Sequence, residues 1–205
     1  MPASPIAVMA SGKGSNLGAI LAAIEAGACP AEVRLALSDR ADAGALAIAR
    51  KAGVAEVAHL NPRDYESREH FDMACAERIE QAGCEWIVLA GYMRILSEAF
   101  VRRFAGRIIN IHPALLPAFP GAHAVRDALE YGVTITGVTV HLVNEVLDGG
   151  PILAQAAVPV REDDTEATLH ARIHEAEHRL YPETLARMIR EGFVVEGRRV
   201  RWKGR

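Results

Sequence analysis

The sequence predicts an α/β protein built as three layers around a mostly parallel, Rossmann-like sheet, with antiparallel strands toward the C-terminal end. Three observations lead to this fold class. Short apolar runs alternate with amphipathic stretches of helical length through residues 6–111. A glycine-rich turn directly follows the first apolar run, at residues 10–17. Two strand-like stretches later follow each other, at 134–143 and 151–160, without a helical pattern between them.

The elements of the first half are predicted from hydrophobic periodicity and from glycines that end helices. Strands are expected at 6–9, 32–37, 54–60, 86–90 and 107–111, and helices at 17–26, 43–52, 63–81 and 96–104. Gly53 and Gly83 are the stop signals of the second and third helices. The run at 86–90 is apolar throughout, which is typical of a strand covered on both faces.

The second half begins with an irregular stretch. Residues 113–123 are rich in Pro and Gly and predict a loop. Thr165 is the expected N-cap of a long helix. In order, the sequence predicts a helix at 124–131, strands at 134–143 and 151–160, a helix at 165–191 and a terminal hairpin at 193–202 around Gly197.

Length and composition limit the class of protein. The 205 residues suit a single domain, with halves at about 1–105 and 106–205. Hydrophobic residues make up 50% and charged residues 24%, and the formal net charge is −3, so no nucleic-acid partner is expected. No apolar run approaches the ~18 residues of a membrane span. Residues 1–5 lack the features of a signal peptide, so no membrane association is expected.

The cysteines indicate a cytoplasmic protein. Cys29, Cys75 and Cys84 are odd in number, and their spacing matches no metal or redox motif. We therefore expect reduced thiols. None of the three lies in a glycine-rich or polar turn of the kind that activates a catalytic thiol.

The glycine-rich turn at residues 10–17 is the first candidate binding site. Free backbone N–H groups and the positive end of a helix dipole favour an anion there, and Ser15 and Asn16 add side-chain donors. A P-loop is excluded, because no Lys-Ser or Lys-Thr follows the required glycine spacing. A dinucleotide fingerprint lacks its third glycine, since Leu17 stands there, although Asp39 lies where a ribose-binding acid would. Two other interpretations of the turn stay open: it binds a single phosphate, or it binds no ligand.

Polar residues also gather at the end of the strand predicted at 107–111. Asn110 and His112 are two residues apart, so on a continuing strand they project to the same side. Asp148 lies in a glycine turn between two later strands. An amide and an imidazole can hold the oxyanion of a tetrahedral intermediate, and a carboxylate can orient and charge the imidazole. Each residue alone also fits a structural role, but together they favour acyl transfer.

At this point the sequence resembles the phosphoribosylglycinamide formyltransferases, the folate-dependent enzymes of purine biosynthesis. The Asn-x-His and Asp-Gly-Gly motifs are shared by a wider group of formyl-tetrahydrofolate enzymes, whereas the Ser-Gly-x-Gly-Ser-Asn turn is specific to this branch. The similar stretches are Ser11 to Leu17, Asp64 to Phe71, Leu89 to Leu96, Asn110 to Pro117, Thr136 to His141, Leu147 to Pro151, and Ala176 to His178. Ala114 and Tyr92 depart from the usual Ser and Phe.

The resemblance implies a single formyltransferase domain and assigns roles to matching positions. Three residues are implied to be catalytic: Asn110, His112 and Asp148. The ribonucleotide is implied to contact Gly14, Ser15, Asn16, His174 and Glu177. The folate is implied to contact Arg68, Met93, Arg94, Ile95, Leu96, Asn110, Asn144, Glu145, Val146, Leu147 and Asp148.

The implied reaction moves the formyl group of 10-formyltetrahydrofolate to the amine of 5′-phosphoribosylglycinamide. The amine attacks directly, and Asn110 and His112 stabilise the tetrahedral intermediate with the assistance of Asp148. The expected partners are these two small molecules, with the protein as a monomer or homodimer and with no metal. A metal site on the face shared by His170, His174 and His178 is the less favoured interpretation of that spacing.

Four other functions remain to be weighed. A formyltetrahydrofolate deformylase would use water in place of the amine and normally carries an N-terminal regulatory domain, which a first strand beginning near Ile6 is not expected to allow. A methionyl-tRNA formyltransferase would need a further domain for tRNA. An NAD-dependent oxidoreductase would depend on the incomplete fingerprint and Asp39. A nucleotide-binding module without catalysis would leave Asn110, His112 and Asp148 unexplained.

Overall fold

The computed structural model describes residues 2–204. Seven strands are hydrogen-bonded in the order β3-β2-β1-β4-β5-β6-β7, and β8 and β9 form a separate pair. The chain divides into two compact units, Met1–Ile109 and Asn110–Arg205. Strand β5 (Ile108–His112) has its first two residues in the first unit and its last three in the second. The expectation of a single domain stays a prediction.

The first unit is built on parallel strands. These are β1 (Ser4–Met9), β2 (Ala31–Ser38), β3 (Glu56–His59) and β4 (Trp86–Leu89). Strand β1 pairs in parallel with both β2 and β4, and β2 pairs in parallel with β3. Ile6, Met9 and Leu35 are fully buried, as expected for strands covered on both faces. The carboxyl ends of β1, β2 and β4 therefore meet at one edge of the sheet.

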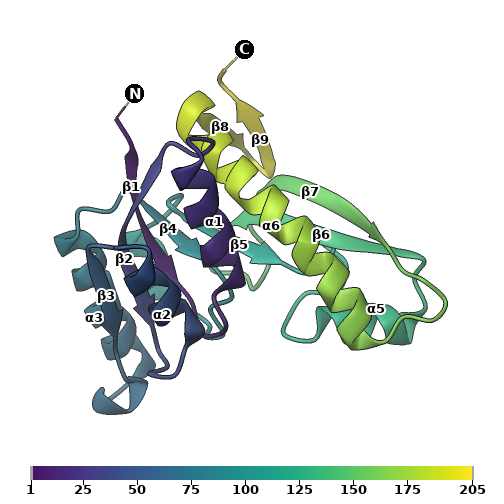
Figure 1. Cartoon of the computed structure of the whole chain (residues 1–205), viewed down its shortest axis with the longest axis horizontal. Helices are drawn as coiled ribbons and strands as arrows, with labels where there is room; N and C mark the ends of the chain where they lie inside the picture. Colours follow the sequence, from purple (N-terminus) through teal and green to yellow (C-terminus); the bar gives the residue numbers. More distant parts are fainter. Residues whose placement is uncertain (1, 205) are drawn as a thin grey trace. The chain divides into compact units, whose positions relative to one another are not determined.

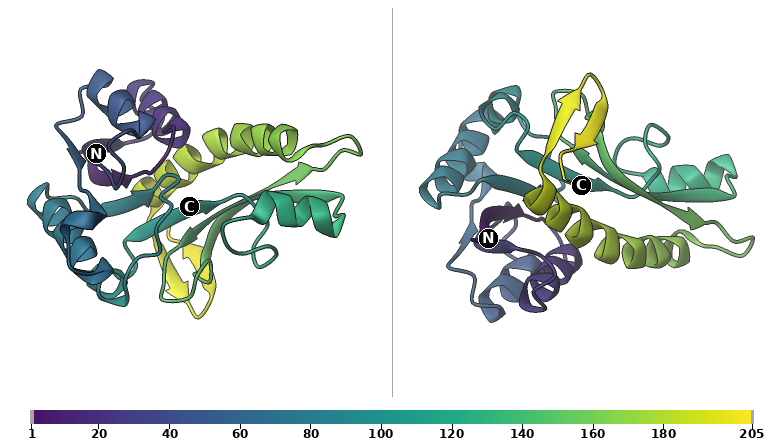
Figure 2. Two further views of the ribbon diagram at one scale, coloured as in Figure 1. Left: turned by 90° about the horizontal axis from the view of Figure 1, so that it is seen from below. Right: turned by 90° about the horizontal axis from the view of Figure 1, so that it is seen from above.

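Helices cover both faces of these strands. They are α1 (Ser15–Glu25), α2 (Gly44–Lys51), α3 (Arg68–Gln81) and α4 (Glu98–Arg103). Helix α1 packs against α2, and α3 packs against α4. Figure 2 shows α1 and α2, in purple and dark blue, on one side of the strands and α3 on the other. This arrangement confirms the layered, mostly parallel fold class.

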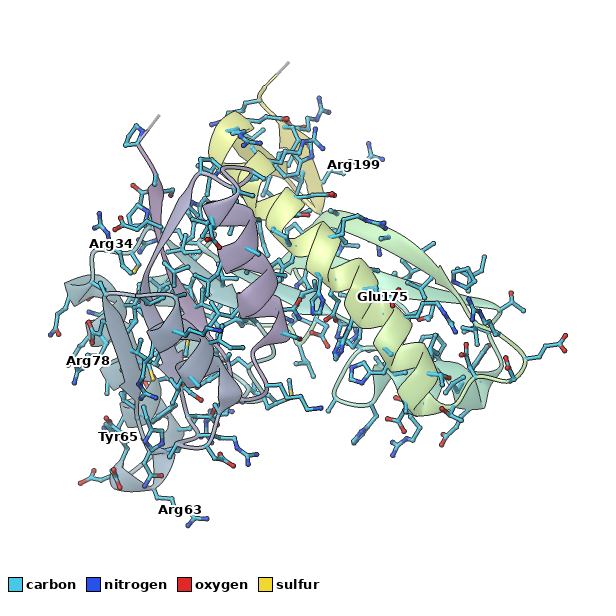
Figure 3. All side chains as sticks on the ribbon, viewed as in Figure 1. Arg34, Arg63, Tyr65, Arg78, Glu175 and Arg199 are labelled. Carbon is cyan, nitrogen blue, oxygen red and sulfur yellow. The ribbon has the colours of Figure 1, made fainter. Side chains whose placement is uncertain are left out.

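The helix predicted over residues 63–81 begins later than the sequence pattern suggested. Pro62 starts a short 3-10 turn, η1 (Pro62–Asp64), and Tyr65 after it is extended. Arg63 and Tyr65 lie in this segment, outside the helix (Figure 3). Ser67 caps α3 by accepting a hydrogen bond from the backbone N–H of His70 at 3.1 Å. The apolar residues that predicted this helix begin only at Phe71, so their periodicity did not mark where the helix starts.

The second unit contains the antiparallel strands. Strands β6 (Ile135–Leu142) and β7 (Ile152–Pro159) pair antiparallel. Helix α6 (Glu166–Glu191) packs against both of them and against α5 (Ala124–Tyr131). In Figure 1, α6 lies along β6 and β7. Strands β8 (Phe193–Glu196) and β9 (Arg199–Trp202) form the expected hairpin, so the antiparallel C-terminal strands are confirmed.

The caps and the loop of the second unit follow the sequence signals. Thr165 caps α6 together with Thr168 in a capping box. Residues 113–123 contain neither helix nor strand, as predicted. Within residues 2–204, none of the helices has the length and apolar content that a bilayer span requires.

Candidate active site

Strand β5 presents the first two polar groups of the candidate site. Ile108, Ile109 and Ile111 are buried β-branched residues, which hold the strand in the sheet. Asn110 and His112 alternate with them and share one side of the strand. The side chain of His112 is only 4% exposed. The sheet core thus fixes the positions of an amide and an imidazole at the end of a strand.

His141, on β6, fixes the orientation of the Asn110 amide. Its Nε2 lies 3.2 Å from Asn110 Nδ2, and its Nδ1 lies 2.8 Å from the carbonyl oxygen of Leu142. A carbonyl oxygen only accepts, so Nδ1 carries the proton and Nε2 accepts from the amide. Burial lowers the pKa of His141, which favours this neutral ring. The Asn110 amide keeps a second N–H for a ligand.

Asp148 lies in the turn between β6 and β7. Its φ is +50°, in the left-handed region that Asp tolerates better than most residues. Gly150 permits the turn, because a Cβ there would lie 1.7 Å from the carbonyl oxygen of Leu142. The backbone N–H of Gly121 donates to Asp148 Oδ2 at 2.8 Å. Only 8% of the carboxylate side chain is exposed, so its charge is held in a poorly solvated place.

His112 faces hydrogen-bond acceptors at both ring nitrogens. Its Nε2 lies 2.8 Å from the carbonyl oxygen of Phe119, and its Nδ1 lies 3.5 Å from Asp148 Oδ2. An imidazolium satisfies both oxygens, since each of its nitrogens carries a proton. His141 Nε2 lies 3.7 Å from the other carboxylate oxygen of Asp148. Amide, two imidazoles and carboxylate therefore form one linked group.

The three residues predicted to be catalytic lie in this group, while their catalytic role stays a prediction. Sequence analysis did not predict a role for His141 in the site, because it is one of the alternating residues of a predicted strand. The available signal was its position at the carboxyl end of that strand, three residues before Asn144 in the segment assigned to folate. Its partnership with Asn110 depends on the pairing of distant strands and is not visible in local sequence.

A cavity of about 450 Å³ borders the Asp148 turn. Arg198 Nη1, from the turn of the terminal hairpin, donates to the carbonyl oxygen of Gly149 at 3.0 Å. This hydrogen bond joins the turn between β6 and β7 to the terminal hairpin. The cavity is lined by Leu116, Pro117, Pro120, Leu147, Asp148, Gly149, Gly150, Ile152 and Arg198. Its surface is mainly apolar with one carboxylate and one guanidinium, as in many small-molecule sites.

The turn after β1 has the geometry of an anion site. Gly14 has a φ of +81°, and a Cβ there would lie 2.5 Å from the Cα of Ala45 in α2. Glycine is therefore required on both conformational and steric grounds. Ser15 and Asn16 open α1, where backbone N–H groups of the first turn point toward an approaching anion.

Most of the residues predicted to contact folate lie in two irregular segments, one in each unit, while Arg68 and Asn110 lie in regular elements. In the first unit, Arg68 opens α3, and Met93 and Ile95 follow β4 with 75% and 59% exposure. Arg94 lies over the ring of Phe71, with 5.0 Å between its Cζ and the ring centroid. These exposed apolar side chains suit the predicted contact with folate, which stays a prediction.

In the second unit, the predicted folate segment runs from Asn144 to Asp148. Val146 and Leu147 are 64% and 57% exposed, so this segment repeats the pattern seen after β4. The backbone N–H of Val146 donates to Asn144 Oδ1 at 3.1 Å, which shapes the turn. Glu145 is exposed between them.

Helix α6 carries the residues predicted to contact the ribonucleotide. Glu177 is 4% exposed, and its Oε2 lies 3.9 Å from His174 Nε2. The ring of His174 lies between those of His170 and His178, with centroid distances of 4.1 Å and 5.9 Å. Among residues 2–204, no group of three His, Cys, Asp or Glu side chains is arranged to hold a metal ion.

The cysteines are poor candidates for a catalytic nucleophile. All three are buried free thiols. Burial raises the pKa of Cys75 to about 12 and that of Cys84 to about 11. A thiol that stays protonated is a poor nucleophile. The chemistry of the site therefore depends on the linked amide, imidazoles and carboxylate.

Comparisons with known proteins agree with this geometry. The family model described as formyl transferase matches residues 4–185. Phosphoribosylglycinamide formyltransferase of Escherichia coli (strain K12) is 46% identical over 177 residues, covering 86% of this chain and 83% of that protein. The protein of the same name from Mycobacterium tuberculosis (strain CDC 1551 / Oshkosh) is 46% identical, covering 96% of this chain and 91% of its own.

A longer relative and a solved structure extend the comparison. The trifunctional purine biosynthetic protein adenosine-3 of Drosophila pseudoobscura pseudoobscura is 48% identical over 90% of this chain, which spans only 14% of that protein. The crystal structure of glycinamide ribonucleotide transformylase 1 from Symbiobacterium toebii matches with a TM-score of 0.95 and 49% identity, covering 98% of this chain and 94% of that one. The chain belongs to the formyl transferase family.

Proposed function

We propose that this protein transfers the formyl group of 10-formyltetrahydrofolate to the amine of 5′-phosphoribosylglycinamide in purine biosynthesis. The observation that carries the proposal is the linked group of Asn110, His112, His141 and Asp148. Similarity to formyltransferases along nearly the whole chain supports the same reaction. The products are the N-formyl ribonucleotide and tetrahydrofolate.

The site residues divide the work of formyl transfer. Asn110 uses the N–H that does not bond to His141 to stabilise negative charge on the formyl oxygen. His112 supplies a second donor by giving up its hydrogen bond to Phe119, since an oxyanion is the stronger acceptor. Asp148 keeps His112 oriented and charged. Its carboxylate also positions the water through which a proton passes from the attacking amine to the leaving nitrogen of the folate.

Substrate binding uses the flanking segments. Gly14, Ser15 and Asn16 hold the phosphate with the first turn of α1. On α6, the carboxylate of Glu177 accepts from ribose hydroxyls beside His174. The remaining residues bind the apolar body and the carboxylate end of the folate. They are Arg68, Met93, Arg94, Ile95, Leu96, Asn144, Glu145, Val146, Leu147 and Asp148.

The test incubates purified protein with 10-formyltetrahydrofolate, with and without 5′-phosphoribosylglycinamide. We expect tetrahydrofolate and the formylated ribonucleotide to appear together, in equal amounts, only when the amine is present. Release of formate without the amine would instead identify a hydrolase. The oxidoreductase alternative is disfavoured because Asp39 accepts a hydrogen bond from the hydroxyl of Ser11 at 2.6 Å.

We also propose a cytoplasmic location and a monomeric or homodimeric protein. The three free thiols suit a reducing compartment. Light scattering of the purified chain measures the oligomeric state, and fractionation of cells that produce it measures the location. A larger assembly or a membrane fraction would contradict this part of the proposal.

A further inference from the structure

The side chain of Ser11 joins three segments of the first unit. Ser11 is 4% exposed and follows β1 by two residues. Its Oγ lies 2.6 Å from Asp39 Oδ1 and accepts a hydrogen bond from the backbone N–H of Met93 at 2.9 Å. Its own backbone N–H donates to the carbonyl oxygen of Gly91 at 3.0 Å. One buried serine therefore contacts the ends of β1, β2 and β4.

The direction of these hydrogen bonds follows from the groups involved. The hydroxyl has a single proton, and the N–H of Met93 can only donate, so the proton of Ser11 goes to the Asp39 carboxylate. A hydrogen bond to a charged acceptor polarises the hydroxyl and strengthens its oxygen as an acceptor. The carboxylate of Asp39 thus strengthens the hydrogen bond that the Met93 N–H donates to the Ser11 hydroxyl.

The segment that Ser11 contacts has no regular secondary structure. Residues 90–97 lie between β4 and α4 and contain neither helix nor strand. At the far end of this segment, the backbone N–H of Ser97 donates to Asp72 Oδ2 at 2.6 Å. Asp72 is fully buried, and burial raises its pKa. Hydrogen bonds therefore hold the segment near both of its ends, and the exposed residues Met93 and Ile95 lie in the same stretch.

We propose that Ser11, polarised by Asp39, is a positioning residue that sets the backbone of residues 93–96 for the formyl-folate. The inference rests on the proposed function, because it takes that segment to be part of the folate site. Ser11 does not touch the reacting atoms. Its hydroxyl acts through the Met93 N–H, so its loss affects the binding of one substrate and spares the chemistry.

The experiment measures both Michaelis constants of Ser11→Ala. We expect the KM for 10-formyltetrahydrofolate to rise about tenfold, because the Met93 N–H loses its part-buried hydrogen bond to the polarised hydroxyl and the backbone of the segment is no longer held. The KM for the ribonucleotide and kcat should each change less than about twofold. Ser11→Thr keeps the hydroxyl and should restore the folate KM. An equal rise in both Michaelis constants, or no rescue by threonine, would overturn the proposal.

Ser4→Ala is a matched control at the other end of β1. The Oγ of Ser4 donates to Glu85 Oε2 at 2.6 Å, and Ser4 is 7% exposed. This variant loses the same kind of hydrogen bond to a carboxylate, at a similar depth, from the first residue of the strand that Ser11 follows. We expect unchanged Michaelis constants. A folate effect as large as that of Ser11→Ala would mean that general destabilisation is the cause.

Asp39→Asn provides a second route if Ser11→Ala fails to fold. The amide keeps an oxygen that can accept from Ser11 but removes the charge, so the folate KM should rise about threefold. Equilibrium binding of 10-formyltetrahydrofolate separates this inference from the proposed function. Weaker binding by the variants supports the inference even if the wild type transfers no formyl group. Equal binding by wild type and variants refutes it even if transfer occurs.

Discussion

The turn after β1 and the turn between β6 and β7 place polar groups at strand ends by opposite means. The first depends on Gly14, whose φ of +81° turns the backbone so that the N–H groups of α1 become donors. The second depends on buried side chains, with Asp148 and His112 only 8% and 4% exposed. Backbone donors do not titrate, whereas imidazoles and carboxylates do. The turn after β1, which we propose as the phosphate turn, should therefore be sensitive to shape, and the turn between β6 and β7, which we propose as the catalytic turn, should be sensitive to charge.

Removing a polar side chain from the linked group of the candidate active site should give the largest effect. Asn110→Ala, His112→Ala and Asp148→Ala are each expected to lower kcat by about 10²–10³, because Asn110 and His112 stabilise developing negative charge and Asp148 holds His112 in place for that task. Steady-state kinetics with both substrates measures this loss, and circular dichroism checks the fold. Asp163→Ala, which removes an exposed carboxylate of the same unit, should leave kcat unchanged. Near-normal turnover by Asp148→Ala would disprove the charge role.

Adding one methyl group to the phosphate turn should give the next largest effect. Gly14→Ala forces a residue with a Cβ into φ +81° and against Ala45, at 2.5 Å from its Cα. The KM for the ribonucleotide should rise about tenfold or more, at the ~1–3 kcal/mol cost of such strain. In Gly18→Ala, the added Cβ meets nothing within 4 Å, so this helical position should tolerate it. Equal behaviour of the two variants would contradict the steric explanation.

The pH dependence of stability distinguishes the two turns further. Burial lowers the pKa of His141 below its ordinary value of 6.5, so the unfolded chain takes up this proton at a higher pH than the folded protein does. The free energy of unfolding should therefore fall as the pH drops from 6.5 toward the folded pKa. His141→Gln should flatten this slope in denaturant titrations at several pH values. An unchanged slope would assign the pH dependence to other groups.

Thiol modification should have the smallest effect, because neither turn uses a cysteine. Burial keeps Cys75 and Cys84 protonated at pH values well above neutral, with pKa values of about 12 and 11. Iodoacetamide at about pH 8 should leave the folded protein active and unlabelled, because alkylation needs the thiolate. Mass spectrometry measures the labelling, and protein unfolded in denaturant is the positive control. Rapid labelling with loss of activity would reveal a thiol with a function.

Local sequence was enough for the elements and for three members of the candidate site. The spacing of Asn110 and His112 on one strand and the position of Asp148 before two glycines are visible without coordinates. His141 was missed because its partner lies on another strand, 31 residues away. Ser11 was seen only as part of a phosphate turn, because its bond to Met93 joins residues 82 apart. Long-range pairing decides such roles, and no local pattern records it.

The glycines of the catalytic turn have a practical consequence for redesign. A Cβ at Gly150 would lie 1.7 Å from the carbonyl oxygen of Leu142, and one at Gly149 would lie 2.5 Å from a methyl group of Val146. Backbone sterics close Gly150 to substitution, and the side chain of Val146 opposes substitution at Gly149, both for reasons unrelated to formyl chemistry. Glu145, Val146 and Leu147 are exposed beside them. A mutant library aimed at new formyl-folate donors should vary those three positions and leave both glycines alone.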